Sequence, residues 1–125
     1  MVFGNFAFVS GQLPRKNGEL RYRGRVGEAV DIDTAQAAAT FCAKACLDAL
    51  DKALGGHDRI AQILKLTGFV ASTPEFTSQG SVIDGASRVL IEALGSRGHH
   101  ACSAVGVQQL PHGAPVEVEL IVGLR

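Results

Sequence analysis

The sequence predicts an α+β domain in which a mixed β-sheet carries two helices on one face. Two segments show the three- and four-residue apolar spacing of amphipathic helices, and one strand-like run separates them. Two further strand-like runs precede the first helix and two follow the second, which gives the order β-β-α-β-α-β-β. Hairpin-type strand pairs flanking helix-connected strands favour one sheet with both helices on the same side. The 125 residues suffice for one core only, so we expect a single domain over residues 1–125.

Composition and charge argue against several classes of partner. Twelve basic and twelve acidic residues cancel, so net charge does not drive binding to nucleic acid or to an anionic membrane. Three cysteines without regular spacing do not make a disulfide framework. The opening residues MVFGNFAFVSG lack the basic and apolar regions of a signal peptide, and no apolar run is long enough to cross a membrane. We therefore expect a cytoplasmic protein with no membrane partner.

The chain is predicted to open with a hairpin. The first strand is expected at Val2–Ser10, and the turn pair Asn17-Gly18 favours a return into a second strand at Leu20–Val26. Alternation along that second strand would place three arginines on one face, namely Arg21, Arg23 and Arg25. This row is either a solvated strand face or an anion-binding patch for RNA or a small carboxylate.

The first helix is predicted to run from a capping box at Asp33–Gln36 to about Leu54, where Gly55-Gly56 ends it. Small apolar side chains recur along one face, so this helix should lie close to the sheet. Cys42 and Cys46 belong to that face, and we expect them to be buried rather than to bind a metal. The four histidines are scattered without the spacing of a zinc site: His57, His99, His100 and His112.

The middle strand is predicted at Ile63–Ala71 and the second helix at about Val82 to Leu94. Within the strand, alternation groups Leu64 with Leu66 and Val70, and it places Ile63 on the opposite face. Gly68 indicates a bulge or a close approach of another backbone or side chain.

The last quarter of the chain is the most informative stretch. It contains two strand-like runs, Ala101–Val107 and Val116–Val122, joined by a turn with two prolines and a glycine. Alternation in the second run places four apolar residues on one face and Glu117, Glu119 and Ile121 on the other. That second face is either exposed to solvent or it forms one wall of a polar binding site. Because 125 residues leave nothing to cover it, we expect oligomerisation through this side of the sheet.

Two motifs of this chain, one at residues 101–120 and FVSGQLP at Phe8–Pro14, resemble those of the RidA/YjgF family, whose members are also labelled L-PSP-type endoribonucleases. Residues 101–120, with the Leu110-Pro111 pair and the VEVE run containing Glu117, are similar to the family signature. FVSGQLP at Phe8–Pro14 lies upstream at the distance the family shows. The resemblance implies the YjgF, or chorismate-mutase-like, fold and a homotrimer with a sheet-lined central barrel. Three clefts between subunits would bind a small-molecule metabolite, without a cofactor or a metal.

The resemblance also implies a reaction, the hydrolysis of 2-imino acids to 2-keto acids and ammonia. Glu117 matches the glutamate that activates the attacking water, and Ser10 and Gly11 match the backbone that borders the cleft. Asp84 stands where the family often has Asn. Cys102 stands where the family has the arginine that binds the substrate carboxylate, and a thiol offers neither charge nor a fork of donors.

Three interpretations of Cys102 remain open: a neutral lining for an uncharged or cationic ligand, a packed structural residue, or a reactive thiol. Three functions also remain open. The chain could bind a metabolite with some hydrolysis of an imine- or enamine-like compound, or act as an imine deaminase anchored by another arginine such as Arg23 or Arg25. It could also be a non-catalytic interaction or chaperone-like trimer. Endoribonuclease activity has only the arginine row in its favour.

Overall fold

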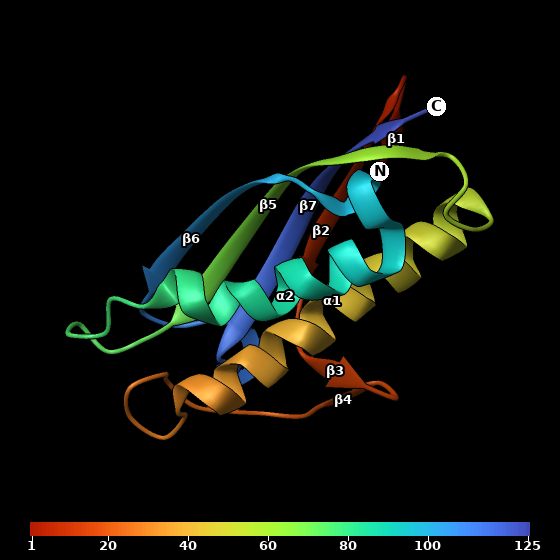
Figure 1. Ribbon diagram of the computed structural model, residues 1–125. Helices are drawn as coiled ribbons and strands as arrows, with labels where there is room; N and C mark the ends of the chain where they lie inside the picture. The colour runs from red at the N-terminus through yellow and green to blue at the C-terminus, as the bar shows by residue number, and fades with distance from the viewer.

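The computed structural model describes residues 1–125, which form a five-stranded mixed sheet with both helices packed on one face (Figure 1). The strand order is β1-β2-β7-β5-β6, and only the β5–β6 pair is parallel. The predicted α+β class is therefore confirmed. The helices and strands have these bounds: β1 Val2–Phe3, β2 Phe6–Gln12, β3 Arg15–Lys16, β4 Glu19–Leu20, α1 Ile32–Leu54, β5 Ile60–Ala71, α2 Gln79–Leu94, β6 Ala101–Val107 and β7 Val116–Leu124.

The predicted second strand at Leu20–Val26 is wrong. Asn17 and Gly18 do form a turn with positive φ, but it joins only the two-residue strands β3 and β4, which are separate from the main sheet. The backbone of residues 21–26 instead donates hydrogen bonds to three distant carbonyls, those of Pro14, Gly113 and Ala71. Gly24 at φ 117° and Gly27 at φ 93° turn the chain away from an extended path. Both edges of β2 are already occupied, by β1 and β7.

Helix α1 begins two residues earlier than the predicted capping box. Asp31 is the N-cap, and its carboxylate accepts a hydrogen bond from the Thr34 N–H at 2.8 Å. Gln36 does not reach back to the cap, because its amide donates to Ser81 O at 2.7 Å. The C-terminus is as predicted, with Gly55 at φ 70°.

The inner face of α1 lies close to the sheet, as its small residues predicted. Cys42 and Cys46 are fully buried, and their thiols approach the carbonyl oxygens of Val116 and Val118 at 3.5 and 3.6 Å. Burial raises the pKa of Cys46 to about 12 and raises the pKa of Cys42 well above its usual value, so both thiols stay protonated. The prediction that these cysteines pack in the helix–sheet seam is confirmed.

One prediction about β5 is right and one is wrong. A register shift between Ile63 and Lys65 reverses the expected alternation there, so Ile63 is buried in the core and Leu64 is exposed. The expected close approach at Gly68 is confirmed, because the Ile83 side chain of α2 lies where a Cβ of residue 68 would be.

The second face of the sheet has no helix over it (Figure 1). Apolar residues of β2 and β6 remain exposed on it, including Phe6, Phe8 and Val105. No helix is both long enough and apolar enough to span a membrane.

Candidate functional site

The predicted water-activating glutamate lies on the face of the sheet that the helices leave open. Val116, Val118 and Leu120 of β7 are buried under the helices, so the alternating Glu117 and Glu119 point to the other side, as predicted. Phe69 and Thr67 of β5 are the cross-strand partners of the two glutamates. The polar face of β7 is therefore a real feature of the fold.

Glu117 packs directly against Gly11. The β2–β7 register is irregular between Val9 and Gln12, and Gly11 lies inside this irregularity. A Cβ at Gly11 would stand 2.7 Å from Cδ of Glu117, so only glycine leaves room for the carboxylate there. The structure thus brings together two residues that the sequence assigned to one site.

The environment of Glu117 suits a proton-transferring group. Partial burial raises the pKa of its carboxyl, and the charge of Glu119 raises it further. A carboxyl whose pKa moves toward neutrality is a better general acid or base than an ordinary surface glutamate. Ser10, the neighbour of Gly11, lines a hollow of about 290 Å³ with Lys65, Thr67 and Glu119.

Cys102 and Asp84 lie together in a different place. Cys102 is exposed on the edge strand β6, and its register partner is Leu66, a core residue, so its side chain is on the helix-covered face. Partial burial raises the pKa of the Cys102 thiol; Lys65 lowers it and the Asp84 carboxylate of α2 raises it. The thiol is therefore neutral at physiological pH and is not activated as a nucleophile.

The five predicted site residues consequently form two groups on opposite faces of the sheet. Gly11 and Glu117, with Ser10 beside them, belong to the open face, and Asp84 and Cys102 belong to the helix-covered face. Within a single chain the two groups do not converge on one ligand. They can meet only if one group is supplied by a neighbouring subunit.

The three arginines of the predicted row have separate positions. Arg21 lies over the ring of Phe41, with 6.0 Å from its Cζ to the ring centre, and Arg23 lines a surface hollow with Arg15 and His112. Arg25 instead donates from Nη2 to Ser72 O at 2.9 Å. The expectation of one basic strand face is wrong, because residues 21–25 are not a strand.

Two further arrangements were not predicted from the sequence. The largest surface hollow, about 630 Å³, is lined by Arg25, Ser72, Gln79 and Gly106 among others. His100 contacts Gly98 O through Nδ1 at 2.6 Å and Ser87 Oγ of α2 through Nε2 at 2.9 Å, so both ring nitrogens have a partner in the segment that leads from α2 into β6. No group of three or more His, Cys, Asp or Glu side chains is arranged to hold a metal ion.

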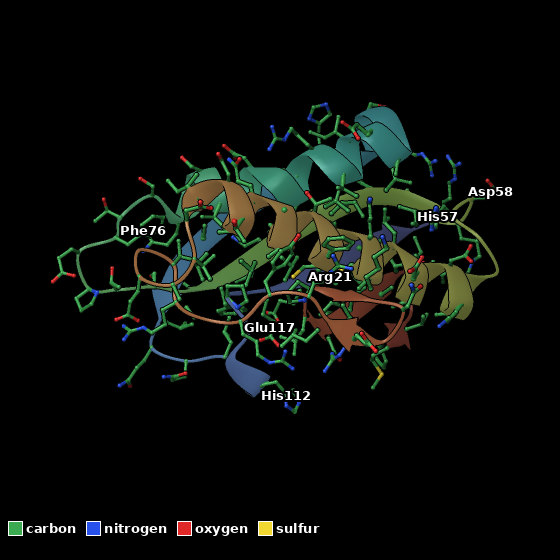
Figure 2. All side chains as sticks on the ribbon, turned by 90° about the horizontal axis from the view of Figure 1, so that it is seen from below. Arg21, His57, Asp58, Phe76, His112 and Glu117 are labelled. Carbon is green, nitrogen blue, oxygen red and sulfur yellow. The ribbon has the colours of Figure 1, made fainter.

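The labelled residues in Figure 2 show where the cleft beside Phe76 and the Glu117 site lie along the molecule. Figure 2 shows Phe76, beside the large hollow, at one end and His57 and Asp58 at the other. Glu117 lies between them, near the turn with His112. His57 Nε2 lies 3.1 Å from Leu47 O in the same chain, and Arg97 donates to the His57 carbonyl, so this end is held by structural hydrogen bonds.

Comparison with known proteins gives consistent matches over nearly the whole chain. The family model described as Endoribonuclease L-PSP matches residues 1–124. Protein TCP17 of Trypanosoma cruzi is 43% identical over 118 residues, which are 94% of this chain and 74% of TCP17.

Solved structures share the fold. The crystal structure of Atu1372, a protein of unknown function from Agrobacterium tumefaciens, is 45% identical with a TM-score of 0.97, covering 99% of this chain and 80% of Atu1372. The YjgF gene product of E. coli is 23% identical with a TM-score of 0.68, covering 100% of this chain and 85% of that one, which shows the common fold alone. Because the family model spans almost every residue and a relative at 43% identity covers 94% of the chain, this chain belongs to the L-PSP endoribonuclease family, which is also called the RidA/YjgF family.

Proposed function

We propose that this protein is a homotrimer that binds a small metabolite without a carboxylate in clefts between its subunits and hydrolyses an imine-type compound there. The observation that carries the proposal is the Glu117 carboxylate, partly buried against Gly11 on a sheet face that no helix covers. A second subunit on this face would shield the carboxylate from water and raise its pKa further.

The positions of Glu117 and Cys102 also indicate that the proposed site needs more than one subunit. Glu117 and Cys102 lie on opposite faces of one sheet, so a cleft that uses both must combine two subunits. The exposed phenylalanines of β2 provide an apolar surface for that contact, with Phe6 46% and Phe8 43% exposed.

The residues on the Cys102 side favour an uncharged or cationic ligand. Cys102 carries no charge and Asp84 is a carboxylate, so neither compensates a ligand carboxylate. The nearest cation, Lys65, already donates a hydrogen bond to Ser103 Oγ at 2.8 Å. Loss of a buried bidentate arginine contact typically costs about 2–5 kcal/mol, which is about 30- to 4000-fold in affinity. A 2-imino acid would therefore be a poor substrate, and an imine of a simple amine a better one.

The chemistry needs only water and one proton-transferring group. Glu117 accepts a proton from a water as the water oxygen attacks the imine carbon, and it passes this proton to the nitrogen to give a carbinolamine. It then accepts the proton of the carbinolamine hydroxyl and passes it to the nitrogen as the carbon–nitrogen bond breaks and the carbonyl double bond forms. One imine and one water thereby give one carbonyl compound and one ammonia.

The proposal is tested by comparing two imines generated in the assay. An amino-acid oxidase supplies a 2-imino acid and an amine oxidase supplies an imine without a carboxylate, and trapping by semicarbazide reports the imine that remains. We expect the native protein to prefer the carboxylate-free imine and Cys102→Arg to shift the preference to the 2-imino acid. Glu117→Gln should remove both activities.

Two outcomes would contradict the proposal. If neither the native protein nor Cys102→Arg accelerates loss of either imine, the cleft is not hydrolytic. If the native protein hydrolyses the 2-imino acid well and Cys102→Arg changes nothing, the ligand carboxylate is bound by another residue.

A further inference from the structure

The largest hollow on the surface lies where the parallel strands β5 and β6 end and α2 begins. Its walls include Arg25, Ser72, Thr73, Phe76, Gln79 and Gly106, and its volume is about 630 Å³. Phe76 marks this end of the molecule in Figure 2. The cleft is large enough for a small metabolite.

Arg25 is the only charged residue of this cleft. A guanidinium has five N–H donors. One of them, on Nη2, is used by Ser72 O at 2.9 Å, and the Nε–H is buried without a partner. Two donors on Nη1 and one on Nη2 are left, and a carboxylate can accept hydrogen bonds from them.

The cleft contains no group that balances this positive charge. None of its nine lining residues is acidic, although Arg25 is half-buried. A partly desolvated cation without a counter-charge is stabilised by an anion. Because one arginine is present with no lysine or histidine beside it, a monoanion such as a carboxylate balances the charge, and a phosphate dianion would not be balanced.

The other residues that line the cleft indicate which further groups a ligand would carry. The Gln79 amide donates to Phe76 O at 2.8 Å and to Ser72 Oγ at 3.4 Å, which leaves its oxygen as an acceptor. Gly106 leaves space in the cleft beside Gln79 and Ser72, since a Cβ there would lie 2.9 Å from both Gln79 Nε2 and Ser72 Oγ. Hydroxyl, amide and backbone groups thus stand beside the arginine.

From these observations we infer that the cleft binds a small hydroxylated monocarboxylic acid, with its carboxylate on Arg25 and its hydroxyl at Ser72 and Gln79. This site is distinct from the proposed imine site. Gly106 is four residues from Cys102 along β6, about 13 Å at the rise of a strand, and its partner Val70 is on the face opposite Glu117.

The inference is tested by amide NMR of the full chain titrated with sodium L-lactate. Lactamide, which has the same shape and hydroxyl but no charge, is the matched control ligand, at constant ionic strength. We expect saturable shifts of the Ser72, Gln79, Gly106 and Val107 signals with lactate only. Arg25→Gln should weaken lactate binding by about tenfold or more, as expected for lost hydrogen bonds to a charged group, and Arg23→Gln should leave it unchanged.

Arg25→Lys serves as a second variant if Arg25→Gln does not fold, because it keeps the charge while losing the fork. The inference is overturned if lactate causes no saturable shift in the native protein, or if lactamide binds equally well. It is also overturned if Arg25→Gln abolishes imine hydrolysis, since Arg25 would then belong to that site. Failure of the imine assay alone leaves the lactate result standing.

Discussion

At the scale of single residues, the state of Glu117 depends on what surrounds one carboxylate. Gly11 allows the side chain to lie flat against β2, and this packing removes part of its hydration. Burial and the charge of Glu119 both favour the protonated form. A surface glutamate on the same strand without these neighbours would be an ordinary anion.

This environment of Glu117 predicts that the stability of the folded chain depends on pH. The folded-state pKa of Glu117 lies above its ordinary value of 4.5, so between these two values the folded chain holds more protons than the unfolded chain. Stability therefore falls as pH rises through that window and stays lowered above it. We expect Glu117→Gln to raise the melting temperature at neutral pH, with the gap closing below pH 4.5.

Glu119→Gln is the matched control, because the charge of Glu119 is the second cause of the raised pKa of Glu117. It should raise the melting temperature at neutral pH by less than Glu117→Gln does. A melting temperature of Glu117→Gln that is equal to or below the native value at neutral pH would contradict the assignment. Circular dichroism melts across a pH series measure both variants.

At the scale of elements, the contact between the helices depends on a glycine inside α2. A Cβ at Gly85 would collide with the backbone carbonyl oxygen of Gln36 in α1. The neighbouring Gln36 amide and the Thr40 hydroxyl also bond to α2 backbone carbonyls, those of Ser81 and Gly85. The two helices are therefore close enough for backbone atoms to take part in the contact.

Gly85→Ala should destabilise the protein by about 1–3 kcal/mol, because a backbone oxygen cannot move aside as a flexible side chain can. Gly80→Ala is the control in the same helix. It is exposed with no atom within 4 Å of the added Cβ, so it should stabilise by about 0.5–1 kcal/mol. Urea unfolding at fixed protein concentration measures both, and equal effects would refute the close contact.

At the scale of the whole molecule, the helices cover one side of the sheet only. The uncovered side combines exposed phenylalanines of β2 with the half-buried Ile121, Phe69 and Glu117. Apolar surface of this kind favours association between copies of the chain. The proposed trimer would bury it and would bring the Glu117 side of one subunit to the Cys102 side of the next.

We predict that the protein sediments at three times its 13.1 kDa chain mass. Phe8→Glu, which places a charge in the uncovered face, should shift it toward the monomer, because burying an unpaired charge is costly. Lys52→Glu on the exposed side of α1 should leave the mass unchanged. Sedimentation velocity distinguishes these outcomes, and a native monomer would exclude the proposed intersubunit cleft.

Much of the fold follows from local patterns in the sequence. The bounds of β6, the C-terminal cap of α1 and the alternation of β7 are predicted correctly, because side-chain periodicity and the low cost of positive φ in glycine act within a few residues. Glu117 on the open face is part of that success. The small residues of α1 likewise predict its close packing on the sheet.

Other features depend on partners far away in the chain. A register shift in β5 exchanges Ile63 and Leu64, and long-range backbone hydrogen bonds take residues 21–26 out of the sheet. Two glycines in that segment, Gly24 and Gly27, were the available signal against a strand. The pairing of strands and the position of Arg25 beside Ser72 have no local signature.

The sequence by itself determined the family and the α+β class, because motifs and periodicity are properties of neighbouring positions. Only the tertiary structure decided that Cys102 and Glu117 lie on opposite faces of one sheet and that Arg25 lines a separate cleft. The physical reason is that side-chain direction follows from strand register and bulges. These are set by hydrogen bonds between segments that are distant in the chain.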